Sequence, residues 1–132
     1  MNGSGFFRKK YRALMKSKLL VNFDCVSDGD HILLAVSKKA RNRYGDAIAN
    51  SFTGNEAKQI LLEKAATVYY PSDQVGFPNT IAIAALKRKR FVGLYMNRIH
   101  TKRDVIFDER NIALLVSCSQ KLIQNIEHSE AL

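Results

Sequence analysis

Apolar side chains recur at helical spacing and then at strand spacing near the start of the chain. Within residues 6–17 they stand three or four positions apart, which predicts a short helix with one apolar and one basic face. The apolar residues are Phe6, Phe7, Tyr11, Leu14 and Met15. Strand-like runs follow over residues 19–26 and 31–36, and Asp28-Gly29 between them favours a tight turn. These two runs predict an antiparallel hairpin.

The middle of the chain gives weaker periodic signals. Residues 38–51 are polar without a lasting period, which predicts a long loop with or without a turn of helix. Thr53 stands three positions before Glu56, as in a capping box, and therefore predicts the start of a helix. The apolar face of that helix would comprise Ala57, Ile60, Leu61 and Ala65. Residues 66–70 form a short β-prone run that ends at Pro71.

The second half predicts a hairpin and a long helix. After a loop over residues 71–79, strand-like runs cover residues 80–86 and 91–96, and the turn between them covers residues 87–90. Asp108 is a good N-cap for a helix whose apolar period persists to Glu127.

This order of elements predicts an α+β fold in which an antiparallel sheet carries helices on one face. With 132 residues the chain is long enough for one domain with one hydrophobic core, and residues 6–132 are assigned to it. Residues 1–5 are small and polar, and we interpret them as a flexible start or a remnant of cloning. No apolar run approaches the roughly 20 residues that a membrane span requires.

Two cysteines, Cys25 and Cys118, occur without a CxxC motif or a histidine at ligand spacing. Both are interpreted as buried thiols of a reducing compartment, which places the protein in the cytoplasm. His31, His100 and His128 are scattered and have no acidic or nucleophilic partner at readable spacing, so they predict surface histidines. The sequence therefore predicts a non-catalytic protein with no metal site, and it identifies no cofactor.

Positive charge is the compositional outlier, because 21 Lys and Arg oppose 12 Asp and Glu and give a net charge of +9. The densest run is residues 87–90, Lys-Arg-Lys-Arg, at the expected hairpin tip. A solvated turn is one interpretation of that run, and a contact with nucleic acid is the other. The aromatic residues that could stack on bases near it are Tyr69, Tyr70, Phe77 and Tyr95. A basic nucleic-acid-binding module is therefore the alternative function.

From about Ala65 onward the chain resembles the second half of GAF domains in the order of its features. These features are a strand at residues 68–70, a loop Asp at Asp73, a strand of small and branched residues at 80–86, the basic turn, a strand with an early glycine at 92–97, and the helix that follows Phe107. The resemblance implies a regulatory module of signalling proteins that senses a small molecule or mediates dimerisation.

The resemblance also implies which residues act. A small ligand would lie between the long loops and the sheet, and the residues assigned to that pocket are Tyr70, Asp73, Thr80 and Ala82. Small side chains at Ala82 and Ala84 either leave room for a ligand or permit close helix packing. The first and last helices would pair in a homodimer and continue into a downstream signalling domain. Their apolar faces, which suit either a core or such a contact, comprise Phe7, Tyr11, Leu14, Leu115, Leu122 and Ile126.

Three specialised GAF chemistries fit the chain poorly. Asn111-Ile112 stand where cyclic-nucleotide-binding members carry an acidic pair, which argues against that ligand. Neither cysteine has the neighbouring histidine that a covalently bound bilin requires, nor are there the several loop cysteines of methionine-sulfoxide reductases.

Overall fold

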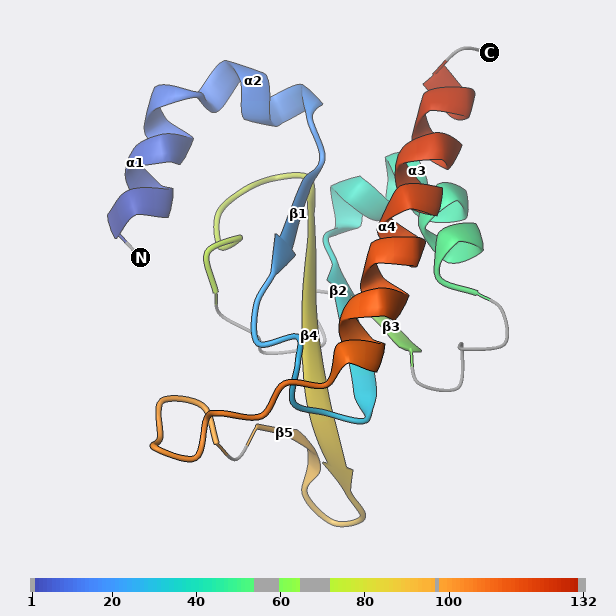
Figure 1. The fold of residues 1–132 in the computed structure, drawn as a ribbon. Coiled ribbons are helices and arrows are strands. Elements are labelled where there is room, and N and C mark those ends of the chain that lie inside the picture. The colour runs from blue at the N-terminus through green and yellow to red at the C-terminus, as the bar shows by residue number, and fades with distance from the viewer. Residues whose placement is uncertain (1, 54–59, 65–71, 97, 131–132) are drawn as a thin grey trace.

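The computed structural model describes residues 2–53, 60–64, 72–96 and 98–130 (Figure 1). In chain order the described elements are α1 (Asn2–Lys10), α2 (Arg12–Ser17), β1 (Leu20–Phe23), β2 (His31–Val36), α3 (Lys38–Ser51), β3 (Ile60–Lys64), β4 (Thr80–Lys89), β5 (Gly93–Tyr95) and α4 (Glu109–Glu130). Among the described residues, no helix is both long and apolar enough to cross a membrane.

The sheet is mixed, with strand order β1-β4-β2-β3 and β5 paired to the far end of β4. β4 runs antiparallel to β2 and β5 but parallel to β1, and β2 runs parallel to β3. The α+β class is thus confirmed, while the expectation of an antiparallel sheet is wrong. β4 lies inside the sheet, between β1 and β2, and its residues 80–86 are all buried.

The predicted hairpin of the first two strands does not form, because β4 lies between them. Bonds to β4 continue past the end of β1, from Asp24 N to Ile83 O and from Ala85 N to Cys25 O, both at 3.0 Å. The chain then crosses to β2 through Gly29, which lies against the β4 backbone. A Cβ on Gly29 would lie 2.7 Å from Leu86 O, so the glycine serves this close approach rather than a two-residue turn.

Residues 38–51, expected as a loop, form the helix α3. Ser37 caps it by accepting a hydrogen bond from Ala40 N at 3.2 Å. Ala40, Tyr44 and Ile48 are buried at intervals of four residues, so one face of this polar segment enters the core. The apolar residues of this segment do follow a helical period. They are so few among the polar residues that the period is hard to detect in the sequence.

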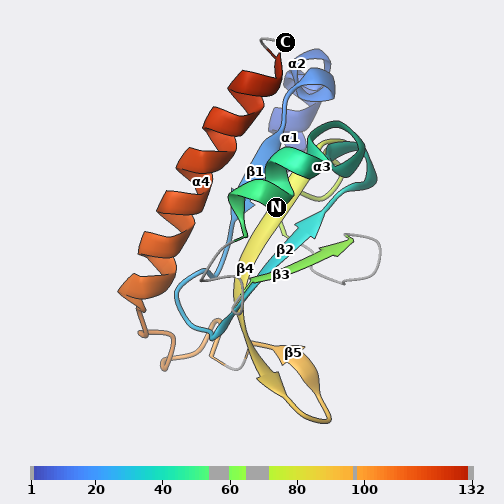
Figure 2. The ribbon, with the colours of Figure 1, turned by 90° about the vertical axis from the view of Figure 1, so that its right-hand side faces the viewer.

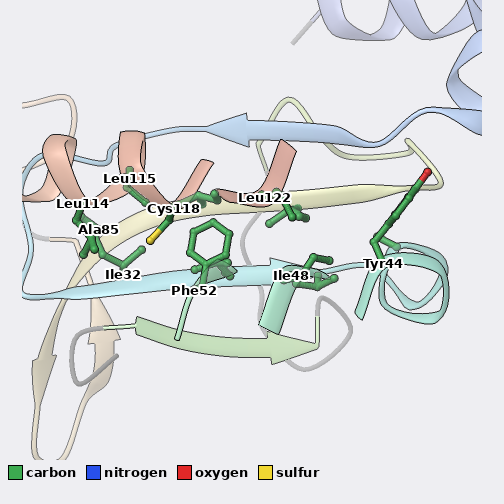
Figure 3. Close-up of a cluster of buried hydrophobic side chains, with 14 residues drawn as sticks. Ile32, Tyr44, Ile48, Phe52, Ala85, Leu114, Leu115, Cys118 and Leu122 are labelled. Atoms are coloured by element: carbon green, nitrogen blue, oxygen red, sulfur yellow. The ribbon is translucent and has the colours of Figure 1, made fainter. Parts of the chain in front are cut away.

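Helices α3 and α4 cover one face of the sheet (Figures 1 and 2). Figure 3 shows Phe52, which follows α3, near Ile32 and Ala85, together with Leu114, Leu115 and Cys118 of α4. Ile48 and Tyr44 of α3 lie farther along β2 in the same cluster. Leu115, Cys118 and Leu122 line the inner side of α4 and are buried. The helix predicted after Asp108 and its placement on one sheet face are therefore confirmed.

The segment around Ile60 forms the strand β3, not the predicted helix, and Ile60 pairs with Ile32 of β2. The Thr53 hydroxyl donates to the Asn50 carbonyl oxygen at 3.3 Å at the end of α3. The remainder of the predicted capping box and helix, and the strand at residues 66–70, lie outside the described residues.

The second predicted hairpin is confirmed, with Lys87 paired to Tyr95 and Lys89 to Gly93. β4 extends through Lys89, so three of the four basic residues belong to the strand and the turn begins only at Arg90. The opposite sheet face packs Leu33, Ala84 and Leu86 against Leu61, Leu94 and Met96.

The predicted first helix is present in two pieces that break at Tyr11, where φ is −109° and ψ is 28°. Residues 2–5, expected as a flexible start, belong to α1.

Candidate functional site

An open groove of about 560 Å³ lies where α1 and α2 meet the loop before β4 and the start of α3. The described residues that line it are Arg8, Lys9, Arg12, Met15, Lys16, Lys39, Gly76 and Pro78. Five of them are cationic, and none of the described lining residues is acidic. We call this the basic groove. Its electrostatic potential favours an anionic ligand.

Hydrogen bonds to the last carbonyls of α2 fix one wall of the basic groove. Lys16 O accepts from Lys39 Nζ at 3.0 Å and from Asn79 Nδ2 at 2.9 Å. Ser17 O accepts from Arg43 Nη1 at 3.1 Å. Carbonyl groups at a helix end lack intrahelical partners, so these donors satisfy them and join α2 to α3 and to the start of β4.

Arg8 joins α1 to the loop on the other side of the basic groove. Its Nη1 donates to Val75 O at 3.4 Å, and its guanidinium occupies the space above Gly76. A Cβ on Gly76 would overlap that guanidinium, and the φ of +85° at Gly76 is itself one that favours glycine. The glycine therefore provides both the turn and the room for Arg8.

Two aromatic rings accompany these cations on the N-terminal helices. The centroids of Phe7 and Tyr11 are 4.6 Å apart at an interplanar angle of 44°, and both residues are exposed. Lys10 Nζ lies 5.4 Å from the Tyr11 centroid. Exposed rings beside a cationic surface are the feature on which nucleic-acid bases stack.

Three of the four residues assigned to a sensor pocket lie within the described part of the chain. Tyr70 lies outside the described residues, and Asp73 is exposed on its loop. Thr80 and Ala82 are buried within β4, at 4% and 1% exposure. None of the three cavities described here is lined by Asp73, Thr80 or Ala82.

The loop that contains Asp73 does contact the sheet through a polar cluster beside Ala82. Asn22, which pairs with Ala82 in register, donates from Nδ2 to Ser72 Oγ at 3.3 Å and to Gln74 Oε1 at 3.0 Å. Ser72 Oγ also donates to a carboxylate oxygen of Asp24. These polar side chains therefore lie beside the region that the GAF resemblance assigned to a ligand.

The residues assigned to dimer helices divide into two groups. Leu115 and Leu122 are buried in the core and Ile126 packs against it, so this apolar face of α4 belongs to the core. Phe7, Tyr11 and Leu14 are exposed. A homodimer stays a prediction, and α4 could join it only through outward residues such as Val116 and Ile123.

A second cavity, of about 390 Å³, lies between the Asp28–Asp30 loop and the β4–β5 hairpin. Its charges are largely paired within the protein. Asp28 accepts from Lys87 Nζ at 3.1 Å and lies 3.6 Å from Arg98 Nη1. Arg110 binds Asp108 at 2.8 Å, and this hydrogen bond lowers the pKa of that carboxyl. Because these ion pairs cancel each other's fields, the cavity lacks the one-signed potential of the basic groove.

Cys25 lines a third cavity, of about 110 Å³, and is half-buried, whereas the sequence interpretation placed it in the core. Desolvation and the neighbouring Asp24 raise the pKa of its thiol from 9.0 to about 11, so it is a weak nucleophile at neutral pH. Cys118 is buried as expected. His31, expected at the surface, is partly buried and contacts Asp30 through Nδ1 at 3.0 Å, which lowers the pKa of Asp30.

Sequence reasoning placed the nucleic-acid contact at residues 87–90 and missed the basic groove. A signal was present, because the first 23 residues contain six Lys and Arg and no Asp or Glu. Lys39 could not be added to that set before the fold placed α3 beside α2.

Within the described part of the chain, no three His, Cys, Asp or Glu residues are grouped so that they could hold a metal ion.

Comparisons with protein-family models, with curated proteins and with solved structures found no match to this chain.

Proposed function

We propose that this protein is a non-catalytic binding module for nucleic acid, and that the basic groove holds the phosphate backbone. One observation carries the proposal: five cationic side chains surround one open groove, with no carboxylate among its described lining residues. Each Lys or Arg that contacts a phosphate releases a condensed counterion, so several such contacts produce substantial affinity without reading sequence.

The surroundings of the groove favour a single strand over a duplex. Phe7 and Tyr11 expose their rings on the same helices that supply Arg8 and Arg12. Unpaired bases can stack on such rings while the backbone follows the cations, whereas the bases of a duplex are already stacked on one another. We therefore expect single-stranded oligonucleotides to bind more tightly than duplexes of the same length.

The test compares two triple variants that remove equal charge from opposite ends of the molecule. The groove variant, Lys9→Gln/Arg12→Gln/Lys16→Gln, removes three lining cations and spares Arg8 and Lys39, which support the walls. The hairpin variant, Arg88→Gln/Lys89→Gln/Lys102→Gln, removes three exposed cations elsewhere. Fluorescence anisotropy with a labelled 20-nucleotide single strand measures the affinity of each variant.

We expect the groove variant to bind roughly 100- to 200-fold more weakly at low salt, since each of the three lost phosphate contacts costs about 1 kcal/mol. The hairpin variant should stay within about threefold of the wild type, since it alters only the long-range field. Equal losses in the two variants would show that net charge alone drives binding, and the proposal would then be wrong.

A small-molecule sensor of the GAF type is the second candidate. The observation that favours it is the contact of Asn22 with Ser72 and Gln74 beside Ala82, where the resemblance assigns a ligand. Native mass spectrometry of the purified protein tests this candidate. A stoichiometric small molecule that is lost in an Asn22→Ala variant would favour the sensor, and clean ligand-free protein would count against it.

A further inference from the structure

The end of the molecule opposite the basic groove exposes apolar side chains on two separate projections, the β4–β5 turn and the loop before α4. We call it the hairpin end and define it as residues 87–96 and 98–107. The β4–β5 turn exposes Phe91 at 91% and Val92 at 63%, and the loop before α4 exposes Val105 at 82% and Phe107 at 65%. Phe91 and Val105 are the two most exposed large apolar residues of the described chain.

The two segments lie side by side at one end of the fold. Ile106 lines the same cavity as Lys87 and Tyr95 of the hairpin, and both views place the segments at the end remote from α1 and α2 (Figures 1 and 2). Hydrogen bonds hold the loop, because Ser27 Oγ donates to Ile106 O at 3.2 Å and Asp108 N donates to Ser27 O at 3.0 Å. The apolar tips therefore project from an anchored base.

Cations surround these tips. Residues 87–107 contain seven Lys and Arg and one carboxylate, Asp104. Lys87 and Arg98 pair with Asp28, while the other five cations are exposed. Those five are Arg88, Lys89, Arg90, Lys102 and Arg103. Arg90 lies over the Phe91 ring, 5.3 Å from its centroid, so charge and apolar surface meet at the tip itself.

We propose that the hairpin end docks on an anionic lipid bilayer, with Phe91, Val92 and Val105 entering the interface and the surrounding cations contacting lipid phosphates. Apolar side chains with basic neighbours are the combination that interfacial binding requires. The phosphates of a nucleic acid could contact the cations. Its bases could not stack on Val92 or Val105, because aliphatic side chains offer no aromatic ring. A protein partner would need a pocket shaped for each protruding tip, whereas a bilayer accepts any convex apolar shape.

The first experiment uses vesicle co-sedimentation with phosphatidylcholine alone and with 30% phosphatidylglycerol, in buffer without nucleic acid. We expect binding to the anionic vesicles and at least tenfold weaker binding to the neutral ones. A Phe91→Ser/Val105→Ser variant should bind the anionic vesicles at least tenfold more weakly, and the hairpin variant should also lose affinity. The groove variant is the matched control and should bind like the wild type.

A second readout reports insertion directly. The chain contains no tryptophan, so a Phe91→Trp variant places the only indole at the hairpin tip. We expect a blue shift of its emission on anionic vesicles and quenching by brominated acyl chains. An Ile123→Trp variant, on the exposed side of α4, should show neither change.

Three results of these experiments would overturn the proposal, and a competition experiment supplies a fourth. They are the absence of binding to anionic vesicles, binding without any change in the Phe91→Trp emission, and loss of binding in the groove variant but not in the hairpin variant. Soluble glycerol 3-phosphate that releases the protein from vesicles would also overturn it, because the ligand would then be the phosphate and not the bilayer. Each result is independent of whether the basic groove binds nucleic acid.

Discussion

The two ends of the molecule carry comparable positive charge but offer it to different surroundings. At the basic groove, cations line a hollow between helices and lie near exposed aromatic rings. At the hairpin end, cations surround convex tips that present Phe91, Val92 and Val105. A net charge predicts anionic partners in general. Shape and apolar content then decide which anionic partner each end suits.

The largest expected difference between the two ends is the dependence of ligand binding on salt concentration. Raising the salt concentration from 50 to 200 mM should weaken binding of a single strand to the basic groove by about 100-fold, if all five lining cations contact phosphates. Vesicle binding should weaken much less, because burial of apolar tips is insensitive to screening. Anisotropy and co-sedimentation over the same salt series measure the two responses. If single-strand binding and vesicle binding weakened equally over the salt series, the proposed difference between the two ends would be wrong.

A substitution in the shared sheet should abolish both activities together. Gly29→Ala would push a methyl group into the backbone of Leu86, and we expect a loss of roughly 3 kcal/mol in the free energy of unfolding. Urea denaturation measures it. The control is Gly45→Ala in α3, where the nearest atom to an added Cβ, Arg41 Cγ, is 3.8 Å away. The free energy of unfolding of that variant should rise by up to about 1 kcal/mol, because alanine has a higher helix propensity than glycine. Equal stability of the two variants would contradict the close approach of Gly29 to β4.

Removing the anchor of the Asp28–Asp30 loop should have a smaller effect. The buried Asn111 donates from Nδ2 to Gly29 O at 2.8 Å, so Asn111→Ala leaves that carbonyl without its partner and should cost about 1–3 kcal/mol. Gln120→Ala, on the exposed side of the same helix, is the control and should change stability by less than about 0.5 kcal/mol. An unchanged urea midpoint for Asn111→Ala would show that this bond does not hold the loop.

The smallest effect concerns the reactivity of Cys25. Because its pKa is raised to about 11, the native thiol should alkylate slowly near neutral pH and reach its half-maximal rate near pH 11, against about 9 in the unfolded chain. The raised pKa contributes stability below pH 9, and that contribution is lost as the pH rises toward 11. Iodoacetamide labelling of a Cys118→Ala variant, followed by mass spectrometry, measures the rate. Rapid labelling at pH 8 would contradict the desolvation of Cys25.

The local sequence predicted the final helix, whose hydrophobic period is long, and the β4–β5 hairpin, whose strands pair directly. The same reasoning failed for β1 and β2, because β4 lies between them. The local sequence did not predict α3, because one buried side chain in four gives a weak period within a polar segment. Nor did it predict β3, whose apolar run of three residues, Ile60 to Leu62, suits a helix or a strand equally well.

The two candidate sites also differ in how far the sequence could have predicted them. Exposed apolar tips at the hairpin end could have been suspected from Phe91 and Val92, which directly follow the basic run. The sequence signals the basic groove only in part, through the six cations of the first 23 residues. Lys39 joins Arg8, Arg12 and Lys16 only after α3 has packed beside α2.

By itself the sequence determined the α+β class, the long C-terminal helix, the second hairpin and the excess of positive charge, since each depends on neighbouring residues or on composition. The tertiary structure alone decided that β4 separates β1 from β2, and that scattered cations form one groove. The physical reason is that strand order minimises the exposed apolar surface of the whole sheet, and residues distant in sequence contribute to that surface as much as near ones.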